Sequence, residues 1–153
     1  MPLLELSEFA RAASGRRLIG LDLGTRTIGV ALSDAGHRIA TPMETIRRIK
    51  FTRDAERLHD ICAEHDIGGL VIGLPLNMDG SEGPRAQATR AFQRNLAQKI
   101  DRPMLFWDER LTTVAAERAM LEADLSRRKR ATRIDAAAAG LILQGVLDRL
   151  RGL

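Results

Sequence analysis

The chain has 153 residues, of which 44% are hydrophobic and 29% are charged. This length is typical of one domain with its own core, and the composition excludes a disordered polymer. No apolar run approaches the roughly 18 residues of a membrane-spanning helix, and the N-terminal residues lack the basic start and apolar run of a secretory signal. Because Cys62 is the single cysteine, an internal disulfide is excluded. We therefore expect a cytoplasmic protein that does not bind membranes.

Basic residues outnumber acidic residues, with 24 Lys and Arg against 20 Asp and Glu and a net charge of +4. All of the basic residues except Lys50, Lys99 and Lys129 are arginines. The planar guanidinium suits phosphate and so indicates a nucleic-acid partner, although a genome whose codons favour arginine explains the bias equally well. Basic side chains are concentrated in one short stretch: Arg127, Arg128, Lys129, Arg130 and Arg133.

The first half of the chain predicts a short helix, three strands and a second helix. Residues 1–15 have the pattern of a short amphipathic helix that ends at a glycine. The β-rich runs at 16–24, at 27–33 and around 38–46 follow one another through short turns, so we expect antiparallel pairing. Apolar residues then recur at helical spacing over 51–66.

The second half of the chain alternates between strands and helices. The expected elements, in chain order, are strand 68–75, polar loop 77–83, helix 84–99, strand 103–107, helix 113–124, basic loop 125–132 and helix 133–150. This alternation is typical of parallel strands joined by crossover helices. The whole chain therefore predicts an α/β fold with a mixed five-stranded sheet, three strands antiparallel and then two parallel, with helices on both faces.

Asp22 is the most informative single residue, because it lies in the apolar strand LIGLDLG. Strand alternation places Leu18, Gly20 and Asp22 on one face of the sheet. A carboxylate among apolar neighbours is costly unless a cation or a hydrogen-bond donor compensates it. We expect that a metal ion or a substrate-borne cation meets Asp22. The alternative is a structural Asp that bonds to the backbone of the turn at Gly24.

Asp108 and Glu109 follow the strand at 103–107, in the segment WDERLTT. Active sites of α/β sheets collect at the carboxyl ends of parallel strands, although acids also favour the first turn of a helix. Since neighbouring residues alternate in direction, only one of the two can lie over the sheet. The local sequence does not distinguish between them.

Asp135 opens the predicted last helix and is followed by four alanines, residues 136–139. Its helical neighbours are apolar, which places Asp135 on the face that packs against the sheet. Small residues let a helix approach the sheet closely, and this brings Asp135 near the strand ends. The alternative is a capping box, in which Thr132 caps the helix and Asp135 reaches back to it.

Three carboxylates, from a strand, a strand end and a helix start, can converge on one site. Oxygen ligands suit Mg²⁺ or Mn²⁺ rather than zinc. Cys62 and the three histidines, His37, His59 and His65, have no zinc-ligand spacing. Two ions about 4 Å apart would support phosphoryl displacement, one by activating the attacking water and the other by stabilising the leaving oxygen.

Four segments together resemble one known family. They are IGLDLGTRTIGVALSD at 19–34, VIGLPLNMDGSEGPRA at 71–86, WDERLTT at 107–113 and RIDAAAAGLILQ at 133–144. Their order and spacing resemble the YqgF (RuvX) family of bacterial Holliday junction resolvases and pre-16S rRNA processing nucleases, over about residues 16–150. The resemblance implies a ribonuclease H-like fold for residues 16–153. Residues 1–15 precede the usual start of the family, and we expect them to be a dispensable N-terminal extension.

The resemblance also implies a hydrolase in which Asp22, Glu109 and Asp135 are the catalytic acids and the ligands of Mg²⁺ or Mn²⁺, with Glu109 preferred over Asp108. The expected activity is metal-dependent cleavage of structured nucleic acid, namely 5′-end processing of pre-16S rRNA in ribosome biogenesis. The alternatives are a Holliday junction resolvase of DNA recombination and a non-catalytic ribosome assembly factor. A resolvase needs a symmetric homodimer with two active sites, whereas an rRNA nuclease can work as a monomer.

Basic residues are expected to hold the nucleic-acid backbone without reading its sequence. The expected contacts are the basic stretch at 126–133 and the helix that carries Arg85, Arg90, Arg94 and Arg102. The alternative for both segments is a solvated face. In the loop at 77–83, Asn77 and Ser81 either touch phosphate or only stabilise the turn. Aromatic residues make up 3% of the chain, so base stacking is not the main source of binding.

Overall fold

The computed structural model describes residues 3–111 and 127–153, with the side chains of 127–135 left out of the description. One five-stranded sheet has the strand order β3-β2-β1-β4-β5. The strands are β1 (Arg17–Leu23), β2 (Thr27–Ser33), β3 (Ala40–Arg47), β4 (Ile67–Leu74) and β5 (Met104–Asp108). The pairs β1–β2 and β2–β3 are antiparallel, and the pairs β1–β4 and β4–β5 are parallel. The predicted mixed sheet is therefore confirmed.

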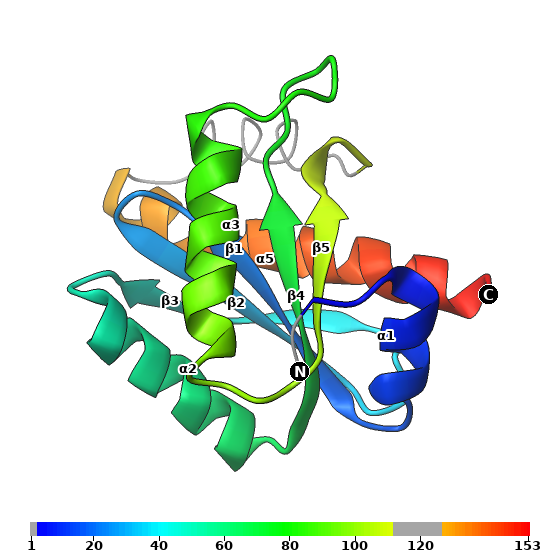
Figure 1. Ribbon diagram of the computed structural model, residues 1–153. Helices are drawn as coiled ribbons and strands as arrows, with labels where there is room; N and C mark the ends of the chain where they lie inside the picture. Colours follow the sequence, from blue (N-terminus) through cyan, green and yellow to red (C-terminus); the bar gives the residue numbers. More distant parts are fainter. Residues whose placement is uncertain (1–2, 112–126) are drawn as a thin grey trace.

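Helices cover both faces of the sheet, as the sequence predicts (Figure 1). The described helices are α1 (Leu6–Ala12), α2 (Phe51–Glu64), α3 (Pro84–Ala97), the short 3-10 helix η1 (Glu109–Leu111) and α5 (Arg127–Arg151). Helices α2 and α3 pack on one face, and α5 and α1 pack on the other. None of the described helices has the length and apolar content that crossing a membrane requires.

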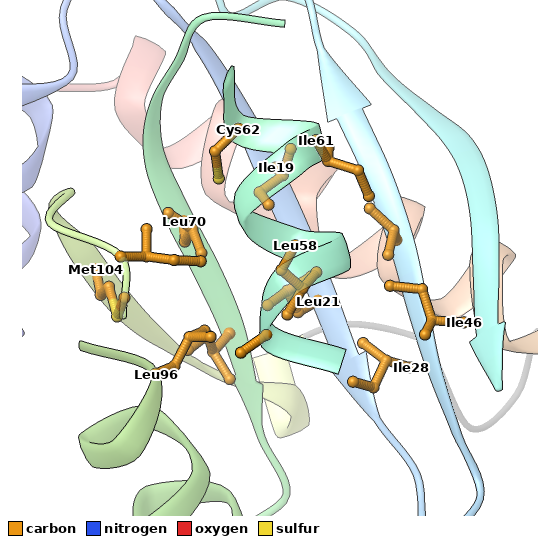
Figure 2. Close-up of a cluster of buried hydrophobic side chains, with 14 of the residues drawn as sticks. Ile19, Leu21, Ile28, Ile46, Leu58, Ile61, Cys62, Leu70, Leu96 and Met104 are labelled. Carbon is orange, nitrogen blue, oxygen red and sulfur yellow. The ribbon is translucent and has the colours of Figure 1, made fainter. Parts of the chain in front are cut away.

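The larger core lies between the sheet and the helices α2 and α3 (Figure 2). Leu58 and Ile61 of α2 and Leu96 of α3 are fully buried against Ile19 and Leu21 of β1. These strand residues alternate with the residues of β1 that face α5, which is why one strand serves two cores. Burial on this scale stabilises the sheet by about 1.5–3 kcal/mol for each large apolar side chain.

On the opposite face, α5 crosses the sheet and approaches it closely because Gly20 has no side chain. A Cβ atom on Gly20 would lie 2.8 Å from the Cβ of Leu143 and 3.1 Å from the carbonyl oxygen of Ala139. Ala138 and Ala139 are buried in the same contact. The small residues of the alanine run therefore let α5 lie directly on β1.

Residues 3–13 pack against this second core, which differs from the expected dispensable extension. The amide of Leu4 donates to the carbonyl of Met104 at 2.8 Å. Phe9 is fully buried, and two of its ring carbons lie 2.7 Å from where a Cβ on Gly69 would be. A buried aromatic ring of this kind contributes several kcal/mol to stability. The segment thus belongs to the folded core, although it precedes the main strand pattern.

The end of the chain also differs from the sequence expectation. The basic stretch at 125–132 was expected to form a loop, but α5 begins at Arg127. Arginine and lysine are good helix formers, and no glycine or proline interrupts residues 127–135. The dense charge of this stretch therefore belongs to the first turns of a helix and not to a loop. The helix expected at 113–124 lies outside the described residues.

Candidate active site

Asp22 is the next-to-last residue of β1 and is 5% exposed. It follows Gly20 by two positions, so it lies on the face of the sheet that α5 covers. Its opposite residue on β2 is Gly29. The structure therefore places this carboxylate where the sequence pattern predicts it, at the carboxyl end of the central strand.

Glu109 follows β5 and lies over Gly73 of β4. Its Cγ and Cδ atoms are 3.2 and 3.3 Å from the position that a Cβ on Gly73 would take, and the Cδ1 of Ile142 in α5 is 2.6 Å from the same point. Glu109 therefore lies between the sheet and α5. The missing side chain at Gly73 creates the space that the glutamate occupies.

The strand register brings Asp22 and Glu109 to the same part of the sheet. Leu21 of β1 pairs with Ile72 of β4, so Asp22 is one step further along, at the level of Gly73. Adjacent strands are about 4.8 Å apart. Two carboxylates from β1 and from the end of β5 thus share one face and one edge of the sheet, the edge where α/β enzymes collect their active sites.

Asp108 belongs to an ion pair next to this site. Arg110 donates to Asp108 through Nε, at 3.1 Å to each carboxylate oxygen, and through Nη2 at 2.7 Å to Oδ2. The Arg110 guanidinium lowers the pKa of Asp108. Asp108 alternates with Trp107, which packs in the α5 core, so Asp108 lies on the other face of the sheet. The structure thus distinguishes the two neighbours: only Glu109 lies on the face that Asp22 occupies.

Asp135 lies in the described backbone of α5, but its side chain lies outside the described part of the structure. It precedes Ala139, whose carbonyl approaches Gly20, by one helical turn of about 5.4 Å. The expectation that Asp135 joins the other two acids stays a prediction. The same holds for the basic side chains of Arg127, Arg128, Lys129, Arg130 and Arg133, which are also outside the description.

The loop at 77–83 is held by its own hydrogen bonds. The amide nitrogen of the Asn77 side chain lies 3.0 Å from the Ser81 hydroxyl, which donates to Asp79 at 2.6 Å. The Asp79 pKa is lowered, chiefly by this hydroxyl. The backbone turns at Gly80, where φ is +89°. The turn interpretation accounts for both side chains, and contact of Asn77 or Ser81 with phosphate is an untested prediction.

The arginines expected to line the nucleic acid fall into different environments. Arg90 pairs with Glu82 at 2.6 Å and lies over the Phe106 ring. Arg102 donates to the carbonyl of Ile67 at 2.7 Å, at the opposite end of β4 from Gly73. Arg94 is exposed on α3. Arg85 alone of these reaches the end of β1, where it donates to the carbonyl of Leu23 at 3.2 Å.

Cys62 and the histidines form no metal centre among the described residues. Cys62 is buried in the larger core, and burial raises its thiol pKa to about 11. Within residues 3–111 and 136–153, no three His, Cys, Asp or Glu side chains are grouped closely enough to hold an ion. The oxygen donors Asp22 and Glu109 are the described part of the candidate metal site.

Sequence reasoning missed Gly73 as a residue that shapes the site. Its signal was present in the sequence, because a glycine inside the apolar strand GLVIGLP marks a place where another group approaches the backbone. The pairing of Asp108 with Arg110 was also missed, although the DER sequence puts the two charges only two residues apart.

Similar solved structures define the class of fold as RuvC-like and ribonuclease H-like. RuvC of Thermus thermophilus, solved in complex with a Holliday junction substrate, matches with a TM-score of 0.57 at 12% sequence identity, covering 89% of this chain and 96% of that one. Ydc2, the yeast mitochondrial Holliday junction resolvase, matches with a TM-score of 0.52 at 12% identity, covering 96% of this chain and 86% of that one. At such low identity, this likeness concerns the fold alone.

The chain belongs to the RuvX family. The family model described as "RuvX: Holliday junction resolvase" matches residues 16–149. A protein of Roseobacter denitrificans named "Putative pre-16S rRNA nuclease" is 62% identical over 154 aligned positions, covering 99% of this chain and 94% of that one. A protein of Cereibacter sphaeroides with the same name is 68% identical, covering 87% of this chain and 83% of that one. The resemblance deduced from the four sequence segments is therefore confirmed.

Proposed function

We propose that this protein is a metal-dependent endonuclease that hydrolyses phosphodiester bonds at the 5′ end of pre-16S rRNA during ribosome biogenesis. The observation that carries the proposal is the meeting of Asp22 and Glu109 on one face of a ribonuclease H-like sheet, at the carboxyl ends of its strands. The names of the relatives that are 62% and 68% identical supply the substrate. The corresponding location of the protein is the cytoplasm, where precursor rRNA is processed.

The donor set fits Mg²⁺ or Mn²⁺, because both described acids offer carboxylate oxygens only. We assign Asp22, Glu109 and Asp135 as the metal ligands, and we expect the site to bind two ions. When bound, the metal would activate the attacking water and stabilise the leaving oxygen. Asp22 and Glu109 would hold this charge against the sheet, where Asp22 is buried and Glu109 lies between Gly73 and α5. Asp108 is bonded to Arg110 and has no role in this scheme.

The basic residues at the start of α5 and on α3 are assigned to the phosphate backbone of the substrate. They are Arg127, Arg128, Lys129, Arg130, Arg133 and Arg85. Because contacts to phosphate position a strand without reading bases, the substrate is recognised by its shape and by the accessibility of the strand. Asn77 and Ser81 are secondary candidates from the neighbouring loop.

Holliday junction resolution is the second candidate, because the matching family model is described by that activity. It requires two active sites related by symmetry and hence a homodimer, whereas the rRNA nuclease can act as a monomer. A non-catalytic assembly factor is the third candidate. It is less well supported, because a binding module has no need for acids at positions 22, 109 and 135.

The test is a side-by-side cleavage assay on pre-16S rRNA and on a four-way DNA junction, each with Mg²⁺, Mn²⁺ or chelator. We expect metal-dependent cleavage of the rRNA and none by Asp22→Asn, which keeps the shape of the side chain and loses its charge. The melting temperature of Asp22→Asn should equal or exceed that of the wild type, because removing one of several like charges relieves repulsion in the metal-free site. Selective cleavage of the junction by a dimer would favour the resolvase, and wild-type rates for Asp22→Asn would remove the nuclease proposal.

A further inference from the structure

Two arginines from different elements are fixed at the end of β1, directly after Asp22. Arg48, which follows β3, donates through Nη1 to the carbonyl of Gly24 at 2.6 Å. Arg85, in the first turn of α3, donates through Nη2 to the carbonyl of Leu23 at 3.2 Å. Two consecutive carbonyls of the chain thus hold two guanidinium groups next to the strand end that carries the candidate catalytic acid.

The two arginines line one small crevice on the α2 and α3 side of the sheet. It has a volume of about 80 Å³ and also includes Gly24, Thr25 and Phe92 in its walls. The guanidinium carbon of Arg48 lies 5.4 Å from the centre of the Phe92 ring. This cation–π contact limits the orientations that the guanidinium group can take. Arg48 is therefore half-buried and oriented, while Arg85 is exposed at the rim.

The charges of Arg48 and Arg85 are not neutralised by acids within the described part of the chain. Other arginines of the fold pair with carboxylates: Arg16 with Asp66 at 2.8 Å, Arg57 with Glu44 at 2.6 Å, Arg90 with Glu82 at 2.6 Å and Arg110 with Asp108 at 2.7 Å. By contrast, no described carboxylate lies within 4.0 Å of Arg48 or Arg85. Carbonyl dipoles fix these two groups but do not cancel their charge, so the crevice attracts an anion.

We propose that Arg48 and Arg85 form a phosphate-binding subsite for the backbone of the RNA strand, on the side of the sheet edge opposite Asp22 and Glu109. The inference rests on the nuclease function proposed above. Each guanidinium uses only one of its five N–H groups in the described bonds, and the others suit the oxygens of a phosphodiester. A strand crossing the sheet edge would then be held on one side by the arginines and cleaved on the other.

The test is a salt titration of binding, with a fluorescent RNA that spans the 5′ end of 16S rRNA and with Ca²⁺ in place of the catalytic metal. Removing two phosphate contacts should lower the slope of log K against log[salt] by about 1.4, at roughly 0.7 for each contact on a single strand. We expect this change in the double variant Arg48→Gln with Arg85→Gln. The matched control, Arg16→Gln with Arg57→Gln, removes two arginines that already have acidic partners and should leave the slope unchanged.

A second pair of substitutions separates charge from geometry and covers a loss of folding in the first. Arg48→Lys with Arg85→Lys keeps both charges, so the slope should stay as in the wild type while affinity falls several-fold, because the planar fork is lost. Thermal melting identifies which variants are folded. An unchanged slope in the folded glutamine variant, or unchanged affinity in the folded lysine variant, overturns the subsite.

The failure of the subsite and the failure of the proposed function give different results. The wild type could cleave the rRNA while the salt slope does not depend on Arg48 and Arg85. This result would reject the subsite and keep the proposed nuclease function. Binding that depends on both arginines, without cleavage in Mg²⁺ or Mn²⁺, removes the nuclease and leaves the subsite. If the wild type binds no RNA at all, both are overturned.

Discussion

The side chain of Glu109 occupies the space that a side chain on Gly73 would need, with its Cγ and Cδ 3.2 and 3.3 Å from the missing Cβ position. The Cδ1 of Ile142 reaches the same point from α5, at 2.6 Å. The position of Glu109 is therefore set by the lack of a side chain at Gly73 in β4 as well as by β5, the strand that precedes it.

We predict that Gly73→Ala impairs cleavage more than it impairs folding. The added methyl must displace Ile142, Glu109 or both, at a cost of about 1–3 kcal/mol in stability, and it moves the carboxylate away from Asp22. The rate should fall by more than tenfold, which is the order of loss expected from a small misplacement. Single-turnover cleavage and thermal melting measure the two effects.

The matched control is Gly69→Ala, on the same strand and the same face. Its methyl would meet the Phe9 ring, 2.7 Å from the Cβ position, so it should lower stability by a similar amount and leave the rate unchanged when measured well below the melting temperature. Equal losses of rate in the two variants would show that Gly73 acts only through global stability.

Glu109→Gln should reduce the rate by several orders of magnitude, and Asp108→Asn should change it only a few-fold. The two acids are sequence neighbours, but Asp108 is bonded to Arg110 and lies on the other face. Cleavage by both variants under the same metal concentrations is the measurement. Greater sensitivity at Asp108 would mean that this side chain changes face when substrate binds.

The difference in stability between the wild type and Asp108→Asn should depend on pH. Arg110 lowers the pKa of Asp108 in the folded protein, so its stabilising effect is fully present above the ordinary value of about 3.9 and is lost as the pH falls through the lowered value. The wild type should therefore exceed Asp108→Asn in stability at neutral pH, by at most about 1 kcal/mol, and the difference should vanish in acid. Denaturant melts from neutral pH to below pH 3 would measure it.

Phe9→Ala should destabilise the protein by about 3 kcal/mol, because the ring is fully buried against the sheet. In a chain of this size, that corresponds to a drop in melting temperature of about 6–12 °C. Deleting residues 1–15 should cost at least as much, contrary to the dispensable extension expected from the sequence. Glu8→Ala, at an exposed position of the same helix, is the control. A deletion with an unchanged melting temperature would contradict the docking of α1.

Replacing Arg127, Arg128, Lys129 and Arg130 with Ala should weaken RNA binding and lower its salt slope by roughly 0.7–0.9 for each phosphate contact removed. Since α5 begins at Arg127, these positive charges lie near a helix N-terminus, where they are unfavourable. The melting temperature should therefore stay the same or rise. Arg53→Ala, in an exposed position on α2, is the control. If the wild type and the quadruple variant have the same salt slope, the four basic side chains face solvent and do not contact the RNA.

The sequence predicted the sheet well, because alternation and turn spacing are local signals. The run TIGVALS and strand β2 coincide residue for residue, and the buried Asp22 could be placed on its face from Leu18 and Gly20 alone. The boundary at Arg127 was missed because charge density says little about backbone conformation. A basic loop and a basic helical turn both lack apolar residues, so the apolar pattern does not discriminate between them.

The choice between Asp108 and Glu109 illustrates what a single sequence leaves open. Local pattern gives both residues a place at the strand end, and the family resemblance alone preferred Glu109. What distinguishes them physically is a contact with Gly73, which is 36 residues away along the chain. Likewise, the docking of Phe9 in α1 depends on Gly69 of β4. A glycine inside a strand signals that some group approaches the backbone there, but which residue fills the space depends on tertiary packing.

The close contact between Gly20 and Leu143 joins the first strand of the sheet to the helix that follows all the other described elements. During synthesis, β1 emerges from the ribosome long before the segment that covers it. Until residue 143 has been made and has reached the sheet, the face that carries Asp22 stays uncovered, and the residues around it lack their packing. The candidate site therefore takes its final shape only after two segments from opposite ends of the described chain, β1 and α5, have come into contact.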